Sequence, residues 1–186
     1  MDALDLMLSR ESAMKLEPPG PTQAELDRIF EVAVRAPDHG RLRPWRFVVI
    51  PTEARERFGE VMADAMRRRD PTASAEALQR ERAKALRAPV IVAVAARVQK
   101  GHKIPEVEQI ASASAAAQTI MLAAPAMGYG AMWKTGDPAY DSGVKQALGL
   151  QADDEIVGFL YLGTRAGGAS PAPRPSAREH VSVWHG

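Results

Sequence analysis

One almost uninterrupted run of apolar residues constrains the fold of this chain more than any other feature. It begins at Val90, directly after Pro89, and its strongest part ends at Ala96, although the pattern continues to Val98. The run is far shorter than the roughly 18 to 20 residues that a membrane-spanning helix needs. Small and β-branched residues without polar alternation are typical of a strand that is buried on both faces. We therefore predict a strand over 90–98 in the interior of a sheet.

Three more strands and a series of helices are predicted around this run. Apolar patterning indicates strands over 46–50, 131–134 and 156–163. Caps and helical spacing predict helices that start at Asp2, after the capping box Thr22–Glu25, and over 52–67, 73–87, 106–127 and 142–148. The sum is an α+β or α/β fold of about four strands and five or six helices. We assign residues 1–165 to a single domain and 166–186 to an extended C-terminal tail without periodicity.

Composition excludes several classes of function. The 186 residues carry a formal net charge of +1, so neither nucleic acid nor a membrane surface is indicated as a partner. The chain has no cysteine, which removes disulfides, thiolate metal sites and a cysteine nucleophile. The alanine-rich stretch 111–127 is interrupted by serines, a glutamine and a proline, so we interpret it as a buried helix. Because the start lacks the pattern of a secretory signal, we expect a cytoplasmic protein.

Three segments place polar or conformationally free groups where architecture alone does not need them. Arg10-Glu11-Ser12 follows the first helix, and a guanidinium with a hydroxyl can hold a phosphate. Arg35 ends the second helix and His39 sits in a loop fixed by Pro37, where both can donate hydrogen bonds. Taken alone, each of the two segments is better explained as a solvated helix end or loop.

The third segment is 128–136, where Gly128 and Gly130 flank an aromatic residue and precede the predicted strand. Glycines permit positive φ and a close approach of the backbone to a flat ligand. Trp133 then offers an aromatic wall, or else it is a core side chain beside a turn. Neither a dinucleotide-binding glycine pattern nor a phosphate-binding loop is present.

Two further groups of charged residues are given structural interpretations. His102, Glu106 and Glu108 have the side chains of metal ligands, but Pro105 between them indicates a loop and a helix start, so no metal site is predicted. The run 67–69 of three arginines is interpreted as a solvated helix end, because it is too short and isolated to indicate nucleic acid.

Taken together and in order, several segments resemble those of the nitroreductase-family FMN flavoproteins, in particular its short NAD(P)H nitroreductases. The similar segments fall within residues 1–165 and are 1–5 with 10–13, Arg35-Ala36-Pro37-Asp38-His39, Pro44-Trp45, His102-Lys103-Ile104-Pro105 and 156–164. The resemblance implies an α+β fold in which helices surround a central, mainly antiparallel sheet. It also implies an interlocked homodimer with two FMN sites at the subunit interface.

The resemblance also implies the activity and the residues that carry it. The protein is expected to transfer hydride from NAD(P)H to FMN and then to a nitroaromatic, quinone or similar electrophilic acceptor in ping-pong fashion. No side chain is expected to be catalytic, because the flavin N5 carries the chemistry. The implied FMN contacts are Arg10, Glu11 and Ser12 from one subunit, Arg35 and His39, and Ala131, Met132 and Trp133 from the other subunit. The implied NAD(P)H contacts are Met121, Leu122, Ala123, Ala124, Pro125 and Ala126.

The chain departs from the family pattern at several positions. Arg41 and Arg43 stand where the family often has asparagine and glutamine, which adds two charges near the substrate mouth. Glu11 replaces the second arginine of the usual Arg-Arg-Ser. Lys15 is the candidate for the basic residue that the family has soon after the serine. Pro125 lies inside the NAD(P)H stretch, where a proline can kink the helix. Arg174 is the candidate for the C-terminal arginine that binds phosphate in some relatives.

Two other classes of protein remain as alternatives. One is a flavin-binding storage or sensor protein with little turnover. The other is a cofactor-free helical interaction module, in which the Arg-Ser and Gly-Trp segments are only structural.

Overall fold

The computed structural model describes residues 2–167 and 175–186, and its centre is a five-stranded sheet. The strand order is β1-β5-β3-β2, and β4 also pairs with β5. All pairs are antiparallel. The strands are β1 (Leu16–Glu17), β2 (Trp45–Ile50), β3 (Val90–Ala96), β4 (Gly130–Lys134) and β5 (Glu155–Arg165). The predicted α+β fold with a mainly antiparallel sheet is therefore confirmed.

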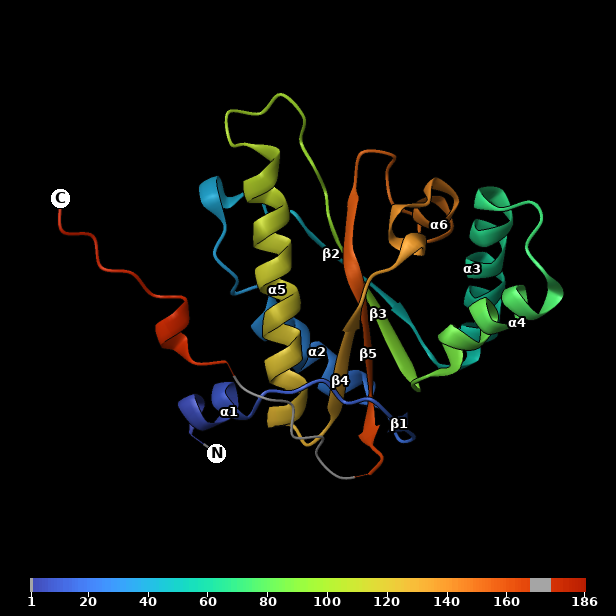
Figure 1. The fold of residues 1–186 in the computed structure, drawn as a ribbon, viewed down its shortest axis with the longest axis horizontal. Coiled ribbons are helices and arrows are strands. Elements are labelled where there is room, and N and C mark those ends of the chain that lie inside the picture. The colour runs from blue at the N-terminus through green and yellow to red at the C-terminus, as the bar shows by residue number, and fades with distance from the viewer. Residues whose placement is uncertain (1, 168–174) are drawn as a thin grey trace.

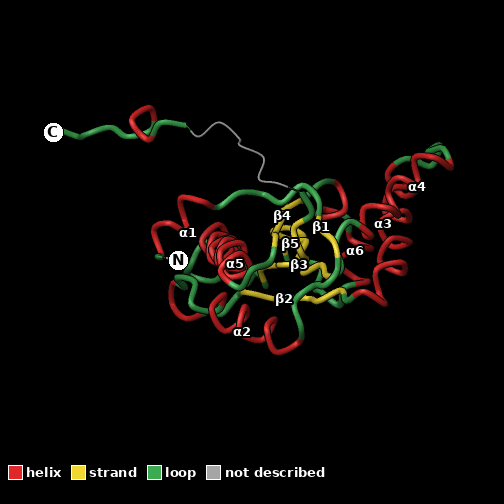
Figure 2. Tube along the Cα trace, turned by 90° about the horizontal axis from the view of Figure 1, so that it is seen from below, coloured by secondary structure: helices red, strands yellow, loops and turns green. Residues whose placement is uncertain are grey.

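Helices cover both faces of the sheet. Figure 2 shows α2 and α5 on one side and α3 and α6 on the other. Within the described residues the α-helices are α1 (Ala3–Ser9), α2 (Gln23–Ala33), α3 (Arg55–Arg69), α4 (Ala75–Ala83), α5 (Glu106–Ala126) and α6 (Ser142–Ala147). None of the helices in this part of the chain is long and apolar enough to cross a membrane.

Strand β3 is the interior strand that the sequence predicts. Every one of its residues is buried. Ile91, Ala93 and Ala95 belong to the core on the α3 side, whereas Val90, Val92 and Val94 belong to the core on the α5 side. The alternation follows from the pleat of a strand, which points successive side chains to opposite faces. The strand ends earlier than predicted, at Ala96, and Arg97 N donates to Pro44 O at 2.7 Å instead.

Strand β5 connects most of the sheet, because it pairs with three other strands. Its residues Phe159–Gly163 pair with β4, and Thr164 and Arg165 pair with β1. The sequence missed β1, since a strand of two residues leaves no periodic signal. Gly158 of β5 lies directly under Trp133 of β4: a Cβ there would come within 2.2 Å of the indole Nε1.

The three arginines at the end of α3 are more than a solvated helix end, so that interpretation was wrong in part. Arg68 forms an ion pair with Asp141, the N-cap of α6, at 2.5 Å, and Arg69 pairs with Asp137 at 3.0 Å. Their carboxylate partners lie about 70 residues away in the sequence, beyond any local pattern. These contacts fasten α6 to α3 on the face opposite α5.

The C-terminal residues 175–186 stand away from the domain in Figures 1 and 2. Their side chains are exposed, including Val181, Val183 and Trp184. Arg174, the proposed C-terminal phosphate ligand, lies outside the described residues. The division into a domain over 1–165 and a tail over 166–186 stays a prediction.

Candidate functional site

The segment that carries Arg10, Glu11 and Ser12 is positioned by α1 and β4. Asp2 caps α1 by accepting from Leu4 N at 3.1 Å, as the sequence predicts. The helix ends where Arg10 N donates to Met7 O at 3.3 Å. The chain then runs along β4, where Ala13 N donates to Ala131 O at 2.9 Å. A Cβ on Gly130 would lie 2.9 Å from the Cβ of Ala13, so glycine allows this close approach.

A pocket of about 200 Å³ opens where this segment meets the end of α5 and the turn before β4. It combines one guanidinium-rich wall with the glycine turn and an apolar wall from α5. Its lining consists of Leu6, Ser9, Arg10, Glu11, Leu122, Pro125, Gly128, Tyr129, Gly130, Ala131 and Arg165. Figure 1 shows these elements converging at the end of the domain that holds α1 and the last turn of α5. Residues of three predicted binding segments therefore meet here within one chain.

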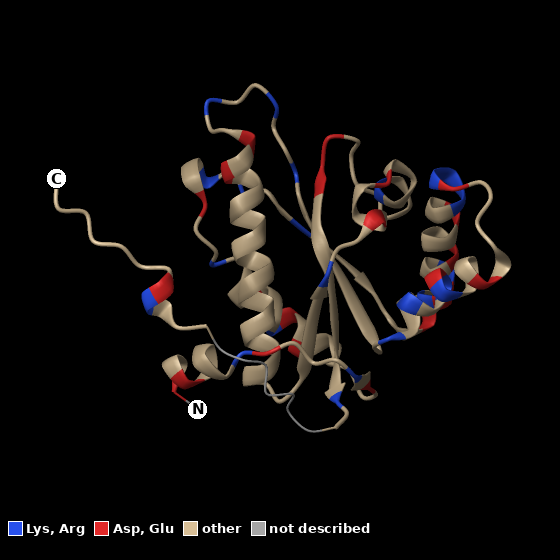
Figure 3. Ribbon diagram, viewed as in Figure 1, with Lys and Arg blue, Asp and Glu red and all other residues tan. Residues whose placement is uncertain are grey.

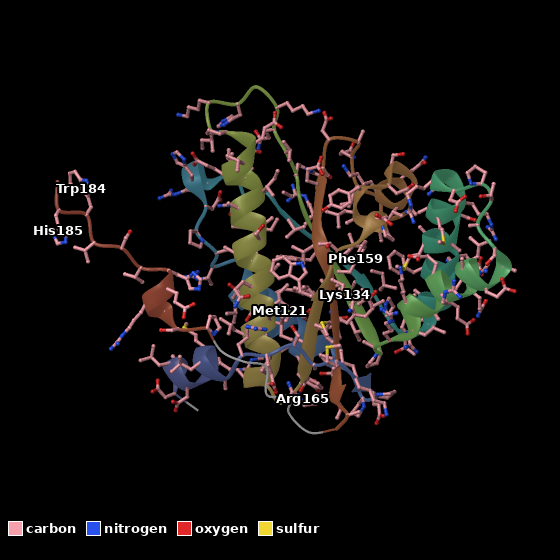
Figure 4. The ribbon with its side chains drawn as sticks, in the orientation of Figure 1. Met121, Lys134, Phe159, Arg165, Trp184 and His185 are labelled. Carbon is pink, nitrogen blue, oxygen red and sulfur yellow. The ribbon has the colours of Figure 1, made fainter. Side chains whose placement is uncertain are left out.

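Arg165 and Glu11 form an ion pair inside this pocket. Their side chains are 31% and 20% exposed, so the pair is largely withdrawn from solvent. Arg165 is the last residue of β5, and Figure 4 shows it at the same end of the domain as the pocket. The pair explains how the chain accommodates a glutamate where the family has an arginine: a guanidinium reaches the pocket from another strand. Sequence reasoning missed Arg165, because no local signal connects positions 11 and 165.

Tyr129 forms another wall of the pocket and is held by Glu25 of α2. Its hydroxyl donates to Glu25 Oε2 at 2.8 Å. The same oxygen accepts from Thr22 Oγ1 at 2.7 Å and from Thr22 N at 2.8 Å, which confirms the predicted capping box. The bonds from Thr22, followed by the bond from Tyr129, lower the pKa of Glu25, and the bond to Glu25 raises the pKa of Tyr129. The start of α2 thus fixes the ring of a pocket residue.

The predicted NAD(P)H stretch divides between the pocket and the core. Leu122 and Pro125 line the pocket, whereas Met121 is only 2% exposed and Ala124 is fully buried. Residues three or four apart on a helix share one face, so the pocket can receive only one side of the stretch. Pro125 lies in the last turn of α5, and Tyr129 N donates to Ala124 O at 2.9 Å just beyond it.

Of the three β4 residues in the FMN prediction, only Ala131 lines the pocket. Met132 is buried in the α3-side core, and Trp133 packs against the α5-side core with its Nε1 donating to Val157 O at 3.3 Å. Trp133 thus packs partly against the core, and its place beside the flavin stays a prediction. Ala131 also lies beside the Arg10 segment of its own chain, whereas the resemblance placed it in the other subunit. The cause is the hydrogen bond between Ala13 and Ala131.

Of the other predicted FMN residues, His39 lies at the opposite end of α5, and Arg35 lies four positions before it, just after α2. Arg35 follows α2, which ends at Ala33 rather than at Arg35 as predicted, and its side chain is exposed. His39 Nδ1 lies 2.6 Å from Glu108 Oε2 in the first turn of α5. A carboxylate at this distance selects the tautomer with the proton on Nδ1, which leaves Nε2 for a ligand.

Ser112 of α5 ties the same loop to the helix. Its hydroxyl donates to Pro37 O at 2.7 Å and accepts from Trp45 Nε1 at 2.9 Å. Two of the three residues that have the side chains of metal ligands make other contacts: His102 Nδ1 accepts from Ile104 N at 3.0 Å, and Glu108 pairs with His39.

The two groups of predicted FMN residues are therefore far apart in one chain. Glu108, which holds His39, and Leu122, which lines the pocket, are fourteen positions apart on α5. At a rise of 1.5 Å per residue, that separation is about 21 Å along the helix axis. Figure 1 shows α1 beside one end of this helix and the short helix His39–Arg41 beside the other.

Comparison with known proteins assigns this arrangement to a family. A family model described as "Nitroreductase family" matches residues 7–164, which hold the His39 loop and all of the sheet and the pocket lining except Leu6 and Arg165. The chain belongs to the nitroreductase family. A family member named "Putative NAD(P)H nitroreductase YdjA" from Escherichia coli (strain K12) is 40% identical over 164 residues, 88% of each chain.

Two solved structures show the same nitroreductase fold. A nitroreductase-like family protein from Bacillus cereus superimposes with a TM-score of 0.84 at 20% identity, covering 100% of this chain and 97% of the other. A structure described as the Y88A mutant of the FMN and NADPH-dependent nitroreductase NfnB, derived from Sphigopyxis sp. strain HMH, gives a TM-score of 0.80 at 22% identity, with 100% of both chains covered.

Proposed function

We propose that this protein is a homodimeric, FMN-dependent NAD(P)H oxidoreductase that reduces nitroaromatic, quinone or related electrophilic acceptors. The observation that carries the proposal is the pocket that joins the Arg10 segment, the Gly128–Ala131 turn and the end of α5. Membership of the nitroreductase family supports it, as do the printed names of the relatives: YdjA is named for NAD(P)H, and NfnB for FMN and NADPH.

The residues of the pocket fit a phosphate-bearing flat cofactor. Arg10 and Arg165 bring guanidinium groups, which form paired, charge-assisted hydrogen bonds to phosphate oxygens. Gly128 has a positive φ of 89° and nothing within 4 Å of a would-be Cβ, so the turn leaves open space for a ligand. In this proposal the phosphate is held by Arg10, which lines the pocket, and by Ser12, which is exposed and lies outside the lining; FMN when bound supplies hydride transfer at N5.

The residues at the other end of α5 supply polar contacts and orientation. Arg35 offers a guanidinium, and His39 offers Nε2 because Glu108 holds its Nδ1. The positive charge of Arg35 stabilises a ligand that gains electron density on reduction. Leu122 and Pro125 give NAD(P)H and the acceptor an apolar surface to enter against. The cytoplasmic location stays a prediction.

A homodimer reconciles the 21 Å separation of the two groups, since one copy would contribute the Arg10 group and the other the His39 loop. Helix α1 supports this arrangement. None of its residues is buried in the single chain, and Leu4 and Leu8 are 65% and 74% exposed. A helix of seven residues is not stable by itself, so a second copy covering its apolar face would stabilise the pocket wall that α1 forms.

The visible absorption spectrum of the purified protein, after FMN is added and the excess removed, tests the proposal. We expect flavin bands that bleach anaerobically with NADPH or NADH and return on addition of a quinone or nitroaromatic. Bands that persist with both donors would favour the storage or sensor alternative. A colourless protein that does not retain FMN would refute the proposal and favour the interaction module.

The shared site has its own test in mixed dimers. Arg10→Ala and His39→Ala are each expected to abolish most activity as homodimers. If each site uses Arg10 of one copy and His39 of the other, an isolated heterodimer of the two variants keeps one intact site of two and recovers about half of the activity. If both residues serve a site within the same copy, the heterodimer stays inactive.

A further inference from the structure

The loop between α2 and β2 carries two arginines in a backbone conformation that side chains other than glycine rarely adopt. Arg41 has a φ of 57° and Arg43 a φ of 50°. Within residues 2–167 and 175–186, they are the two residues other than glycine with positive φ. The left-handed region costs free energy for L-residues, least for asparagine and glycine. Such strain persists where the surrounding structure enforces it, and it concentrates at functional sites.

The enforcing contacts are visible on both sides of the loop. The carboxylate of Asp38 accepts from Leu42 N at 3.1 Å and from Arg43 N at 2.8 Å. Arg46 Nη1 donates to Arg43 O at 3.1 Å. A side chain of the loop and a side chain of β2 thus hold the backbone that presents the two arginines. These hydrogen bonds stabilise the loop in this backbone conformation.

The charges of this loop are not neutralised by their surroundings. Arg41 and Arg43 are exposed, and among the described residues no carboxylate oxygen lies within 4 Å of their side-chain nitrogens. The nearby acidic groups are already engaged: Asp38 accepts backbone N–H groups, and Glu108 pairs with His39. Figure 3 shows the basic residues of the loop beside the acidic start of α5.

A third arginine reinforces the local positive charge. Arg46 is partly buried, and burial together with the charge of Arg97 lowers its pKa, while Asp154 raises it. Arg97 itself is exposed beside the loop, because its N–H bonds to Pro44 O. Like charges gathered in one place destabilise a protein unless carboxylates or a bound anion balance them, and Asp154 is the one carboxylate among the described groups that shift the pKa of Arg46.

We propose that Arg41 and Arg43 form an oxyanion-recognition element beside His39, and that a substrate of this enzyme carries a carboxylate or phosphate that it binds. The inference rests on the proposed function, because His39 is one of the residues assigned to the flavin site. Two guanidinium groups one residue apart on a fixed loop suit the bidentate geometry of an oxyanion. The oxyanion has two possible sources: a carboxylate on the acceptor, or the additional phosphate that distinguishes NADPH from NADH.

The decisive variant is Arg41→Asn/Arg43→Asn, because asparagine accepts positive φ and the loop keeps its backbone. Steady-state kinetics would compare 4-nitrobenzoate with the neutral 4-nitrobenzamide, and NADPH with NADH. We expect the KM for 4-nitrobenzoate, or for NADPH, to rise roughly tenfold or more, because the variant loses a charge-assisted hydrogen bond to the substrate. The KM values for 4-nitrobenzamide and NADH should stay within about twofold. Whichever charged substrate responds identifies the source.

Two controls separate recognition from general electrostatics. Arg57→Gln/Arg80→Gln removes the same charge from exposed arginines of α3 and α4 and should leave the preference for charged substrates unchanged. Arg41→Lys/Arg43→Lys keeps the positive charge but removes the bidentate guanidinium donors. Its KM for the charged substrate should lie between those of the wild type and the asparagine variant. Equal changes for the charged and neutral members of both substrate pairs would overturn the proposal.

A measurement without turnover separates this inference from the proposed function. Calorimetric titration of the purified protein with 4-nitrobenzoate and with inorganic phosphate reads anion binding whether or not FMN is reduced. We expect the wild type to bind one of them at least about tenfold more tightly than Arg41→Asn/Arg43→Asn does. Equal affinity of both proteins would refute the role of the arginines, whereas a failure to retain FMN would refute the proposed function instead.

Discussion

Replacing Arg165 by methionine removes the guanidinium that faces Glu11 but keeps most of the side-chain length. Glu11 then remains in the pocket with 20% of its side chain exposed and without its cation. Exposed ion pairs contribute up to about 1 kcal/mol, and breaking a fully buried pair costs about 3–5 kcal/mol. The intermediate burial of this pair places the loss at about 1–2 kcal/mol of unfolding free energy. For a chain of this size that corresponds to a fall in Tm of about 2–8 °C.

A double-mutant cycle with Glu11→Gln isolates the interaction. Glu11→Gln alone should cost less, because Arg165 is 31% exposed and can stay hydrated. Combining the two substitutions should recover about 1 kcal/mol relative to the sum of the single variants. Thermal unfolding would be followed at one fixed, saturating FMN concentration, because ligand binding adds to apparent stability. Additive losses within about 0.3 kcal/mol would refute the reasoning that the two side chains stabilise each other.

Three other predictions follow from single contacts. Arg10→Ala should weaken FMN binding by about 1.5–3 kcal/mol, measured by fluorescence titration, and an unchanged Kd would remove Arg10 from the phosphate site. Gly158→Ala would bring a Cβ within 2.2 Å of Trp133 Nε1 and should destabilise the protein by about 1–3 kcal/mol, measured by denaturant unfolding. Hydrogen bonds from Thr22 lower the pKa of Glu25 below 4.5, so its contribution to stability is present above that value and is lost as the pH falls through the lowered pKa. Glu25→Gln should flatten the fall in Tm below pH 4.5, and an unchanged acid limb would show that other carboxylates dominate.

Most helices and strands could be predicted from the sequence, because the signals that specify each of them lie within that element. Burial on both faces of β3 follows from its unbroken run of small and branched residues. The capping box of Thr22 and Glu25 marks the start of α2. Boundaries moved where a distant partner decided them: β3 ends at Ala96 because Pro44, which faces the next residue, accepts its N–H but has no N–H to return.

The site was less predictable, because its decisive contacts join residues far apart in the sequence. Glu11 meets Arg165 only after β1 and β5 pair. Glu25 serves a second purpose at Tyr129, which the capping-box pattern does not indicate. The packing of Trp133 was an open alternative until the register of β4 on β5 placed it near Gly158. Each of these contacts depends on strand register, which a single sequence specifies only through the whole fold.

The placement of the two proposed half-sites connects cofactor binding to assembly. Helix α1 lines the pocket through Leu6 and Ser9, yet it buries no residue of its own in the single chain. A second copy that covers α1 would stabilise the pocket wall and would bring a His39 loop to it. FMN bound to such a site contacts both copies, so it stabilises the dimer by the same free energy by which dimer formation improves FMN binding. In the proposed homodimer, a substitution at either end of α5 therefore affects cofactor affinity and subunit affinity together.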